Sequence, residues 1–399
     1  SINKFLIYGF LKTDTPRCAE GANAIARAVN RCRFESSSAA DDEATLMSLL
    51  EVTENVVRSD AGAHLTDDNV WQLIKSCHRL AHMEHASPLL RKSAESTLTN
   101  ILLALFSALP STTSANDTPA ATASAVFAAE GSLQAVGDGV PTQLPPAALR
   151  AATTPHGVPV LTRILRWLAR MTDMKRVIDI SAAKPASSKP VAGAAFDPWD
   201  DAALVATDEV MGAAAGGVDD DVARRALCTS SLRHINVALE TAGPSMGHHP
   251  ELVRAVQVDV CKHLVSNSRT QDLLVLSLTL RVVFNLFIAL KSHLKVQLEV
   301  FFTSVHLHLA DAISLSPEHK EQALESLLEF CREPMLMLDL YVNYDCDVMC
   351  TNLFETLCSS CCKNAVPASG PLNSLHITAL EGVLAVVDNI AQGCAAYAQ

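Results

Sequence analysis

The chain is poor in aromatic residues, which make up 5% of its 399 residues. Val, Thr and Tyr also do not alternate with polar residues in the period-two runs that mark half-buried strands. A β-sheet protein is therefore disfavoured. In contrast, 49% of the residues are hydrophobic, which is enough for sizeable cores in two or three domains. These features predict an all-α fold.

Signals of the common enzyme classes are missing. No Gly-rich loop ends in the Gly-Lys-Ser/Thr that binds phosphates, and no nucleophile elbow is legible. No pair of carboxylates is arranged for acid–base catalysis either. We therefore predict no catalytic residue and no cofactor in this chain.

Basic residues are fewer than acidic ones, and the formal net charge is −12. No stripe of Lys and Arg is present, so nucleic-acid binding has little electrostatic support. Most of the excess charge lies in one segment without Lys or Arg. Its eight acidic residues are Asp197, Asp200, Asp201, Asp208, Glu209, Asp219, Asp220 and Asp221.

Twelve cysteines are present and the first residues show no secretory signal, which indicates reduced thiols in the cytosol. One group of five suggests a zinc site at first sight. Its spacing instead follows a helical stripe without paired zinc knuckles, so small buried thiols are favoured. The five are Cys346, Cys350, Cys358, Cys361 and Cys362.

Three histidines offer a second metal alternative. His78, His82 and His85 recur at i, i+4 and i+7, which would place their imidazoles near one helical face. No fourth ligand is indicated, so we predict no metal site here.

One apolar stretch, residues 273–290, suggests a membrane span. It is at the short end for crossing a bilayer and contains Arg281 near its centre. We interpret it as a helix packed on all sides inside a helical stack.

The first folded unit is predicted to span residues 1–109. Thr66 is a candidate N-cap before one amphipathic helix, and Ser87-Pro88 starts the next, which Pro110 ends. The apolar face of this second helix exceeds what one hairpin partner can cover, which makes it the candidate surface for the dimerisation that the family resemblance given below implies. Its candidate residues are Leu90, Lys92, Glu95 and Leu98.

Two segments are predicted to be flexible linkers, residues 110–157, rich in Ala, Ser, Thr and Pro, and residues 182–221, which contain the acidic run. Between them, residues 158–181 contain an amphipathic helix that needs a partner and is expected to dock on the second unit. Phe196 and Trp199 in the acidic linker resemble a short motif that docks into coat-adaptor pockets, although a plain solvated linker is the favoured alternative.

The second unit, residues 222–399, is predicted to be a series of helices of about 15 to 20 residues joined by short turns. Paired helices of this length suggest an armadillo or HEAT-like superhelix. Its expected helices are 222–242, 250–266, 272–293, 294–312, 317–332, 347–362 and 372–390.

A polar, aromatic and acidic cluster at residues 341–347 and 351–355 interrupts two helical patterns. We predict that Asn343 and Asp345 bond amides of a turn, that Tyr341 and Tyr344 pack, and that Asp347 caps the next helix. The same turn could also present a contact surface. The site residues are Tyr341, Asn343, Tyr344, Asp345, Asp347, Asn352 and Phe354.

This cluster resembles the homology-upstream (HUS) box of the large guanine-nucleotide exchange factors that act on Arf GTPases at the Golgi. Other stretches resemble the same family in the same order, including its N-terminal dimerisation and cyclophilin-binding (DCB) region. The likeness favours the Golgi-specific, brefeldin-A-resistance type. The stretches are residues 1–6, 68–77, 89–95, 156–159, 165–168, 293–299 and 363–367.

The resemblance implies a regulatory region that forms homodimers, contacts its own catalytic exchange domain and the small GTPase, and lies in the cytoplasm, peripheral on Golgi membranes. In this family the catalytic domain would follow Gln399, so we expect no exchange activity from this chain. Two alternatives remain open: a free-standing helical-repeat scaffold or transport adaptor, and a metal-dependent enzyme built on the histidines or cysteines.

Overall fold

The computed structural model describes residues 2–12, 14, 16–32, 39–83, 86–109, 156–173, 218–312, 315–367 and 370–397. Every regular element in these ranges is helical, which confirms the predicted all-α fold. Most of both predicted linkers lies outside the described residues, as do Phe196 and Trp199. Residues 218–221, predicted as the end of the second linker, belong to a helix.

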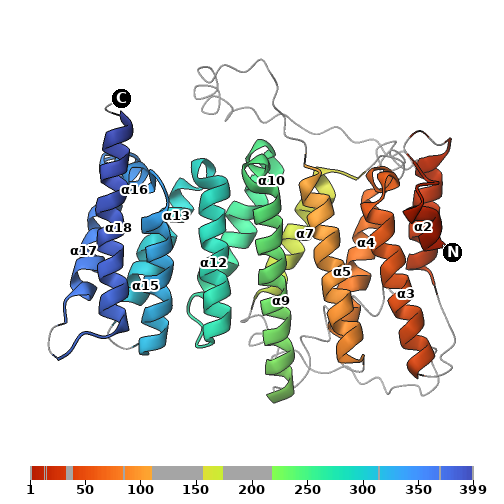
Figure 1. The fold of residues 1–399 in the computed structure, drawn as a ribbon, viewed down its shortest axis with the longest axis horizontal. Coiled ribbons are helices and arrows are strands. Elements are labelled where there is room, and N and C mark those ends of the chain that lie inside the picture. The colour runs from red at the N-terminus through yellow and green to blue at the C-terminus, as the bar shows by residue number, and fades with distance from the viewer. Residues whose placement is uncertain are drawn as a thin grey trace, which may run out of the picture.

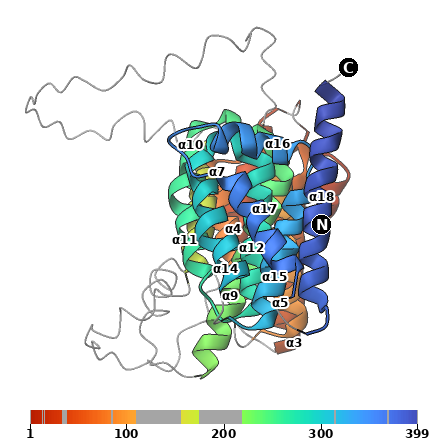
Figure 2. The ribbon, with the colours of Figure 1, turned by 90° about the vertical axis from the view of Figure 1, so that its left-hand side faces the viewer.

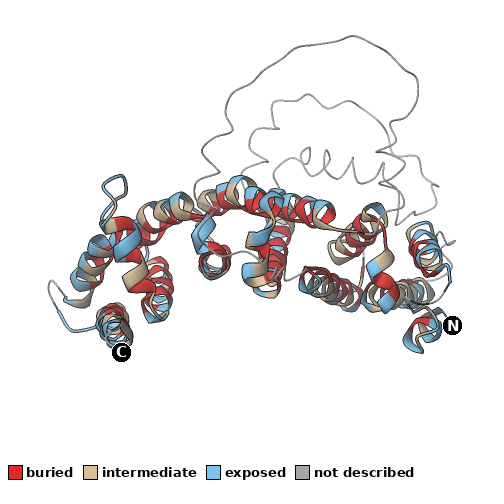
Figure 3. Ribbon diagram, turned by 90° about the horizontal axis from the view of Figure 1, so that it is seen from above, coloured by how far each residue is buried: buried red, intermediate tan, exposed pale blue. Residues whose placement is uncertain are grey.

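The helices stack side by side in two rows, as Figures 1 and 3 show. In the front row each helix packs against the next one in chain order. The front row consists of α3 (Ala39–Arg58), α5 (Pro88–Ser107), α9 (Val218–Ala242), α12 (Leu273–Leu290), α15 (Pro317–Arg332) and α18 (Ser374–Tyr397).

The back row covers the other side of the core, and most of its members pack on a front-row helix. This two-row arrangement agrees with the predicted helical repeat. Its helices are α2 (Cys18–Asn30), α4 (Asp67–Ala81), α7 (Val158–Met171), α10 (Pro250–Ala255), α11 (Cys261–Asn267), α13 (Lys295–Phe301), α14 (His308–Asp311), α16 (Leu336–Leu340) and α17 (Leu353–Ala365). The short α1 (Ile2–Ile7) packs on α3 at the N-terminal end.

Local sequence signals place several helix ends correctly. α4 begins directly after Thr66, although the Thr66 side chain makes no capping hydrogen bond. α5 begins after Ser87, whose Oγ accepts a hydrogen bond from the Leu90 amide at 3.1 Å. At α12 the Asp272 carboxylate accepts from the amides of Leu274 and Val275. These bonds satisfy amides that have no partner within their own helix.

Three helical segments of the back row contain a π-helical turn, at Val256–Val260, Phe302–Leu307 and Tyr341–Asp345. The first two join α10 to α11 and α13 to α14, so each pair forms the single long segment that the sequence predicts. The third carries part of the HUS box. Such turns widen a helix locally and are frequent at functional sites.

The predicted excess apolar face on α5 is covered inside the molecule. α3, α4 and α9 all pack on α5, so both Leu90 and Leu98 are buried. The reasoning that placed a dimerisation surface on these two leucines is therefore wrong, because the sequence did not show that α9 returns to cover them. Lys92 is exposed and Glu95 is half-buried.

The long apolar helix is also a core element. Half of the residues in Leu273–His293 are buried, and α9 and α15 pack on α12 from either side. By length and composition it could cross a membrane, but its burial supports the interpretation as a packed helix. Figure 1 shows α12 between α9 and α15, and Figure 2 shows the stack end-on.

Candidate functional site

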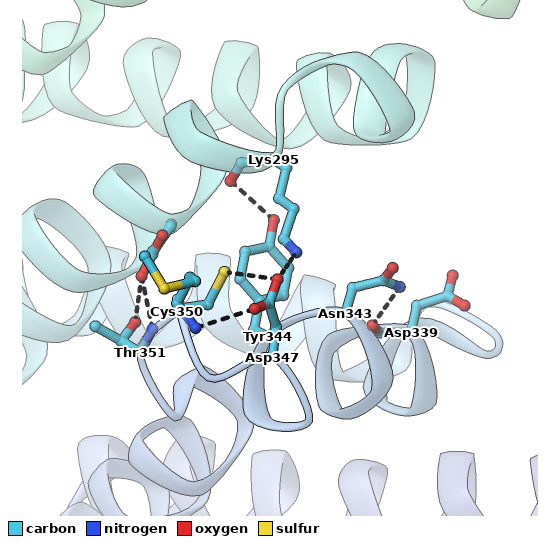
Figure 4. Close-up of polar contacts among 9 residues, drawn as sticks. Lys295, Asp339, Asn343, Tyr344, Asp347, Cys350 and Thr351 are labelled. Atoms are coloured by element: carbon cyan, nitrogen blue, oxygen red, sulfur yellow. Dashed lines mark hydrogen bonds and ion pairs between the residues drawn. The ribbon is translucent and has the colours of Figure 1, made fainter. Parts of the chain in front are cut away.

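The HUS box lies near the C-terminal end of the back row, between α13 and α17 (Figure 4). Its π-helical turn continues directly from α16 and is followed by a loop that leads into α17. The side chains of the turn and loop reach across to the segment that starts α13. The box therefore connects parts of the chain that are about 50 residues apart.

Lys295 at the start of α13 is the centre of this connection. Its Nζ lies 2.7 Å from Asp347 Oδ2, and its carbonyl oxygen accepts a hydrogen bond from the Tyr344 hydroxyl at 3.0 Å. The ammonium also lies 5.6 Å from the Tyr344 ring centre, within range of a cation–π contact. The hydrogen bond between Lys295 and Asp347 lowers the pKa of Asp347 and raises the pKa of Lys295. Tyr344 is buried, and burial raises the pKa of its hydroxyl.

The loop after the π-helical turn is held at both ends. Asp347 accepts a hydrogen bond from the Met349 amide at 3.0 Å, and Glu299 of α13 accepts from both the amide and the hydroxyl of Thr351 at 2.8 Å. These bonds fix a loop in which Val348 and Met349 are almost fully exposed. The predicted capping role of Asp347 is wrong, because the following helix begins at Leu353 and not at Asp347.

Asp345 is the residue that caps α17. Its two carboxylate oxygens accept hydrogen bonds from the amides of Phe354, at 2.8 Å, and Glu355, at 3.0 Å. Sequence reasoning expected Asp345 to bond turn amides nearby. In the structure its carboxylate instead bonds a helix that starts eight residues later, because the loop returns the start of α17 to Asp345.

The remaining box residues have smaller roles. Asn343 is exposed and donates to the Asp339 carbonyl at 2.8 Å, a bond within its own helical segment. The prediction that Asn343 bonds amides of a turn is therefore wrong, because its side chain donates to a carbonyl of its own helical segment. Tyr341 is exposed but its ring lies edge-on to Phe354, with 5.9 Å between ring centres. Asn352 precedes α17 and donates to Glu355 at 3.0 Å.

The Asp345→Ala variant is expected to lower the free energy of unfolding by about 1 to 2 kcal/mol, because two amides of the first turn of α17 lose their acceptor. Asn343→Ala is the matched control. It removes one exposed intrahelical bond, so its effect should stay within about 0.5 kcal/mol. Urea denaturation of both variants measures the difference. Equal losses for the two variants would contradict this assignment.

Among the described residues, no group of three or more His, Cys, Asp or Glu is arranged to hold a metal ion. His78 and His82 do lie together on α4, with 4.3 Å between ring centres, but His85 lies outside the described residues. Cys361 and Cys331 are buried, and Cys346 and Cys362 are exposed. Neither metal alternative receives geometric support from these parts of the chain.

A second arrangement, which sequence reasoning missed, joins the N-terminal helices to the rest of the stack through α7. Trp167 of α7 lies edge-on to Trp71 of α4 at 5.5 Å and to His78 at 4.5 Å. The Arg163 guanidinium lies 4.3 Å from the Trp71 ring centre. On its other side α7 pairs with the next back-row segment through Arg166 and Asp259, at 3.1 Å. α7 therefore docks on both predicted units and not only on the second.

Three partly or fully buried imidazoles lie beside this junction. His234 of α9 is near Thr99 of α5, with 3.4 Å between Nε2 and Oγ1, and its Nδ1 is buried without a hydrogen-bond partner. Nε2 of His78 is also buried and unpartnered. Burial is the main cause that lowers the pKa of His78 and lowers that of His234 to about 4, and the nearby imidazoles contribute to both shifts in the same direction. Burial also lowers the pKa of His82.

Residues 216–353 match the family model described as the Mon2/Sec7/BIG1-like HUS domain. The chain is 26% identical over 98% of its length to the ARF guanine-nucleotide exchange factor GNOM of Arabidopsis thaliana. It is 25% identical over 99% of its length to a Golgi-specific brefeldin A-resistance guanine nucleotide exchange factor 1 homolog of Caenorhabditis elegans. It covers 28% of the first relative and 24% of the second.

Similarity to the brefeldin A-inhibited type is shorter. The Bos taurus guanine nucleotide-exchange protein 1 of that type is 33% identical over 34% of this chain, which covers 7% of the relative. The Golgi-specific homolog and GNOM match almost the whole chain, which agrees with the subtype that the sequence favours. The match to the HUS model at residues 216–353 and the similarity over 98% of the chain are consistent with the DCB–HUS region of the large Arf guanine-nucleotide exchange factors.

Proposed function

We propose that this chain is the regulatory, dimerising and membrane-targeting region of a Golgi Arf exchange factor. The observation that supports this best is the extent of the similarity. Relatives named as guanine-nucleotide exchange factors match 98% or more of the chain, while the chain spans only about a quarter of their length. The family model that it matches describes the HUS domain, which is not the catalytic domain.

The geometry fits a rigid platform better than a catalytic site. The HUS box ties α13, α16 and α17 together through Lys295, Asp347 and Asp345. Asp345, Asp347 and Tyr344 all make structural hydrogen bonds, and the bond from Lys295 lowers the pKa of Asp347. In this proposal the box keeps the C-terminal end of the stack in one shape, so that surfaces around it meet a partner in a fixed orientation.

The partners follow from the same proposal. The chain forms a homodimer, contacts its own catalytic exchange domain and an Arf GTPase, and binds the cytoplasmic face of Golgi membranes peripherally. The parent protein then promotes GDP-to-GTP exchange on Arf and so starts coat recruitment. A coat adaptor docking at Phe196 and Trp199 is a further proposal on residues outside the described ranges.

Purified chain is expected to leave the rate of GDP release from purified Arf at its intrinsic value. The reason is that the matched family model describes the HUS domain and not the exchange domain. The assay follows a fluorescent GDP analogue on Arf with increasing amounts of the chain. A purified exchange domain from a relative serves as the positive control. Acceleration that rises in proportion to the chain would contradict the proposal.

A further inference from the structure

The last helix of the front row, α18, leaves one face uncovered. It packs on α15, α16 and α17 through Ala379, Val386 and neighbouring residues, and it stands at the outer edge of the stack (Figures 2 and 3). The opposite face carries four aliphatic residues at helical spacing. These residues, the α18 stripe, are Ile377, Leu380, Leu384 and Val387, with 53%, 48%, 60% and 62% of their surface exposed.

The amount of exposed apolar surface sets α18 apart from the other apolar helix. In Leu273–His293 half of the residues are buried, because α12 has neighbours on both sides. In Ser374–Ala395 only 22% are buried. Water-exposed aliphatic residues in a continuous row are costly, and such rows mark sites that another molecule or segment covers.

The rest of the front row indicates what kind of partner fits. Each front-row helix from α5 onward packs on the next, and each of these contacts includes an ion pair between a basic and an acidic side chain. In repeat proteins such a contact recurs from one unit to the next. The pairs are Arg233–Glu95 at 3.8 Å, Arg281–Glu240 and Arg281–Glu329 at 3.6 Å, and Arg332–Glu381 at 3.0 Å.

Along the edge of the α18 stripe the charge is negative. α18 contains no Lys or Arg, and Glu381 is already paired with Arg332 of α15. Asp388 is exposed, four residues after Leu384, and accepts a hydrogen bond from Gln392 of the same helix at 2.6 Å. A basic side chain on a neighbouring helix could therefore form an ion pair with Asp388, as basic and acidic side chains do at the other contacts in the front row from α5 onward.

We propose that the α18 stripe binds an amphipathic helix that carries aliphatic residues at three- and four-residue spacing and Lys or Arg along its margin. This helix lies beside α18 as α18 lies beside α15, and so extends the front row by one member. A second copy of this chain fits less well, because two α18 helices without Lys or Arg would bring Asp388 of each copy to the shared edge. An anionic membrane surface would meet the same acidic edge.

The test uses the purified chain and two synthetic 22-residue helical peptides, a length that matches the exposed window. Both peptides carry Leu at alternating three- and four-residue spacing. One has Lys at the margins, and its twin has Glu at the same positions. Fluorescence anisotropy measures the Kd of each labelled peptide.

The Lys peptide is expected to bind more tightly than its Glu twin. Leu384→Ser should raise the Kd for the Lys peptide by about tenfold, because the exposed leucine side chain no longer contributes buried area. Asp388→Asn should reduce the difference in Kd between the Lys peptide and the Glu peptide. Val258→Ser, which changes an equally exposed aliphatic residue on the back row, should leave both Kd values unchanged. Circular dichroism checks that all three variants stay folded.

Other outcomes would overturn the proposal. If Leu384→Ser and wild type bind the Lys peptide equally, the α18 stripe is not the binding surface. If the Glu twin binds as tightly as the Lys peptide, the charge argument is wrong. Sedimentation equilibrium, and flotation with phosphatidylcholine vesicles with and without phosphatidylserine, identify the two rival occupants. A dimer or vesicle binding that Leu384→Ser abolishes, without peptide binding, would assign the face to a second copy or to lipid.

Discussion

Lowering the pH from 7 to 5 is expected to destabilise the fold strongly, because buried neutral histidines take up protons when the chain unfolds. Burial lowers the pKa of His234 and of His306 from 6.5 to about 4. Between these values the unfolded chain binds protons that the folded chain does not. Stability is therefore fully present above about pH 6.5 and is lost as the pH falls toward 4. Between pH 7 and pH 5 each of the two histidines should lower the free energy of unfolding by roughly 2 kcal/mol.

Charged neighbours shift the pKa values of His82 and His234 in opposite directions. Glu95 raises the pKa of His82 and Arg233 lowers that of His234, but burial is the larger cause for both. The acid sensitivity should therefore depend mainly on burial and only slightly on salt concentration.

Urea midpoints at pH 7 and pH 5, followed by tryptophan fluorescence, measure this loss. His234→Leu and His306→Leu each remove one titrating group, so each variant should lose less stability than wild type between the two pH values. His293 is exposed, and His293→Gln should lose as much as wild type. Equal midpoints for wild type at pH 7 and pH 5 would contradict the prediction.

Leu98→Ala is expected to lower the free energy of unfolding by about 2 to 5 kcal/mol, because it leaves a cavity in a packed core. Leu98 is fully buried, with 0% of its surface exposed, and α3, α4 and α9 pack on its helix. Thermal and urea denaturation should both record the loss. The same change should not act through a dimer contact, since no part of Leu98 faces solvent.

Leu89→Ala is the matched control in the same helix. Leu89 is 66% exposed, so the variant should stay within about 0.5 kcal/mol of wild type. Sedimentation equilibrium of both variants at tens of micromolar, a range that reveals modest affinities, separates stability from self-association. Weaker self-association for Leu89→Ala would place the proposed dimer contact on the outward side of α5, beside Lys92. Equal destabilisation by the two variants would contradict the placement of Leu98.

The helices themselves could be predicted from sequence, because each depends on local signals. Ser87-Pro88 starts α5, Asp272 caps α12, and apolar spacing indicates which face of each helix is buried. The extents of two back-row segments, residues 250–266 and 294–312, were also predicted, although their π-helical turns were not. A single widened turn changes few side-chain positions, so it leaves the apolar spacing almost unaltered.

The HUS box could be located but only partly explained. Its aromatic and acidic residues differ from the apolar helices on either side, which is a property of the sequence alone. The partners of Tyr344, Asp345 and Asp347 could not be predicted. Tyr344 and Asp347 both bond Lys295 at the start of α13, and Asp345 bonds the Phe354 amide in α17. These contacts depend on how the rows stack.

The sequence by itself determined that this chain is helical, where several helices begin, and which family it resembles, since caps, spacing and short motifs are local. Only the tertiary structure decided that α9 covers Leu98, that α7 joins Trp71 to the rest of the stack, and that α18 keeps an open apolar face. An amphipathic pattern shows that a face needs a partner. Which helix becomes that partner depends on the packing of segments far apart in the chain, and no local pattern records it.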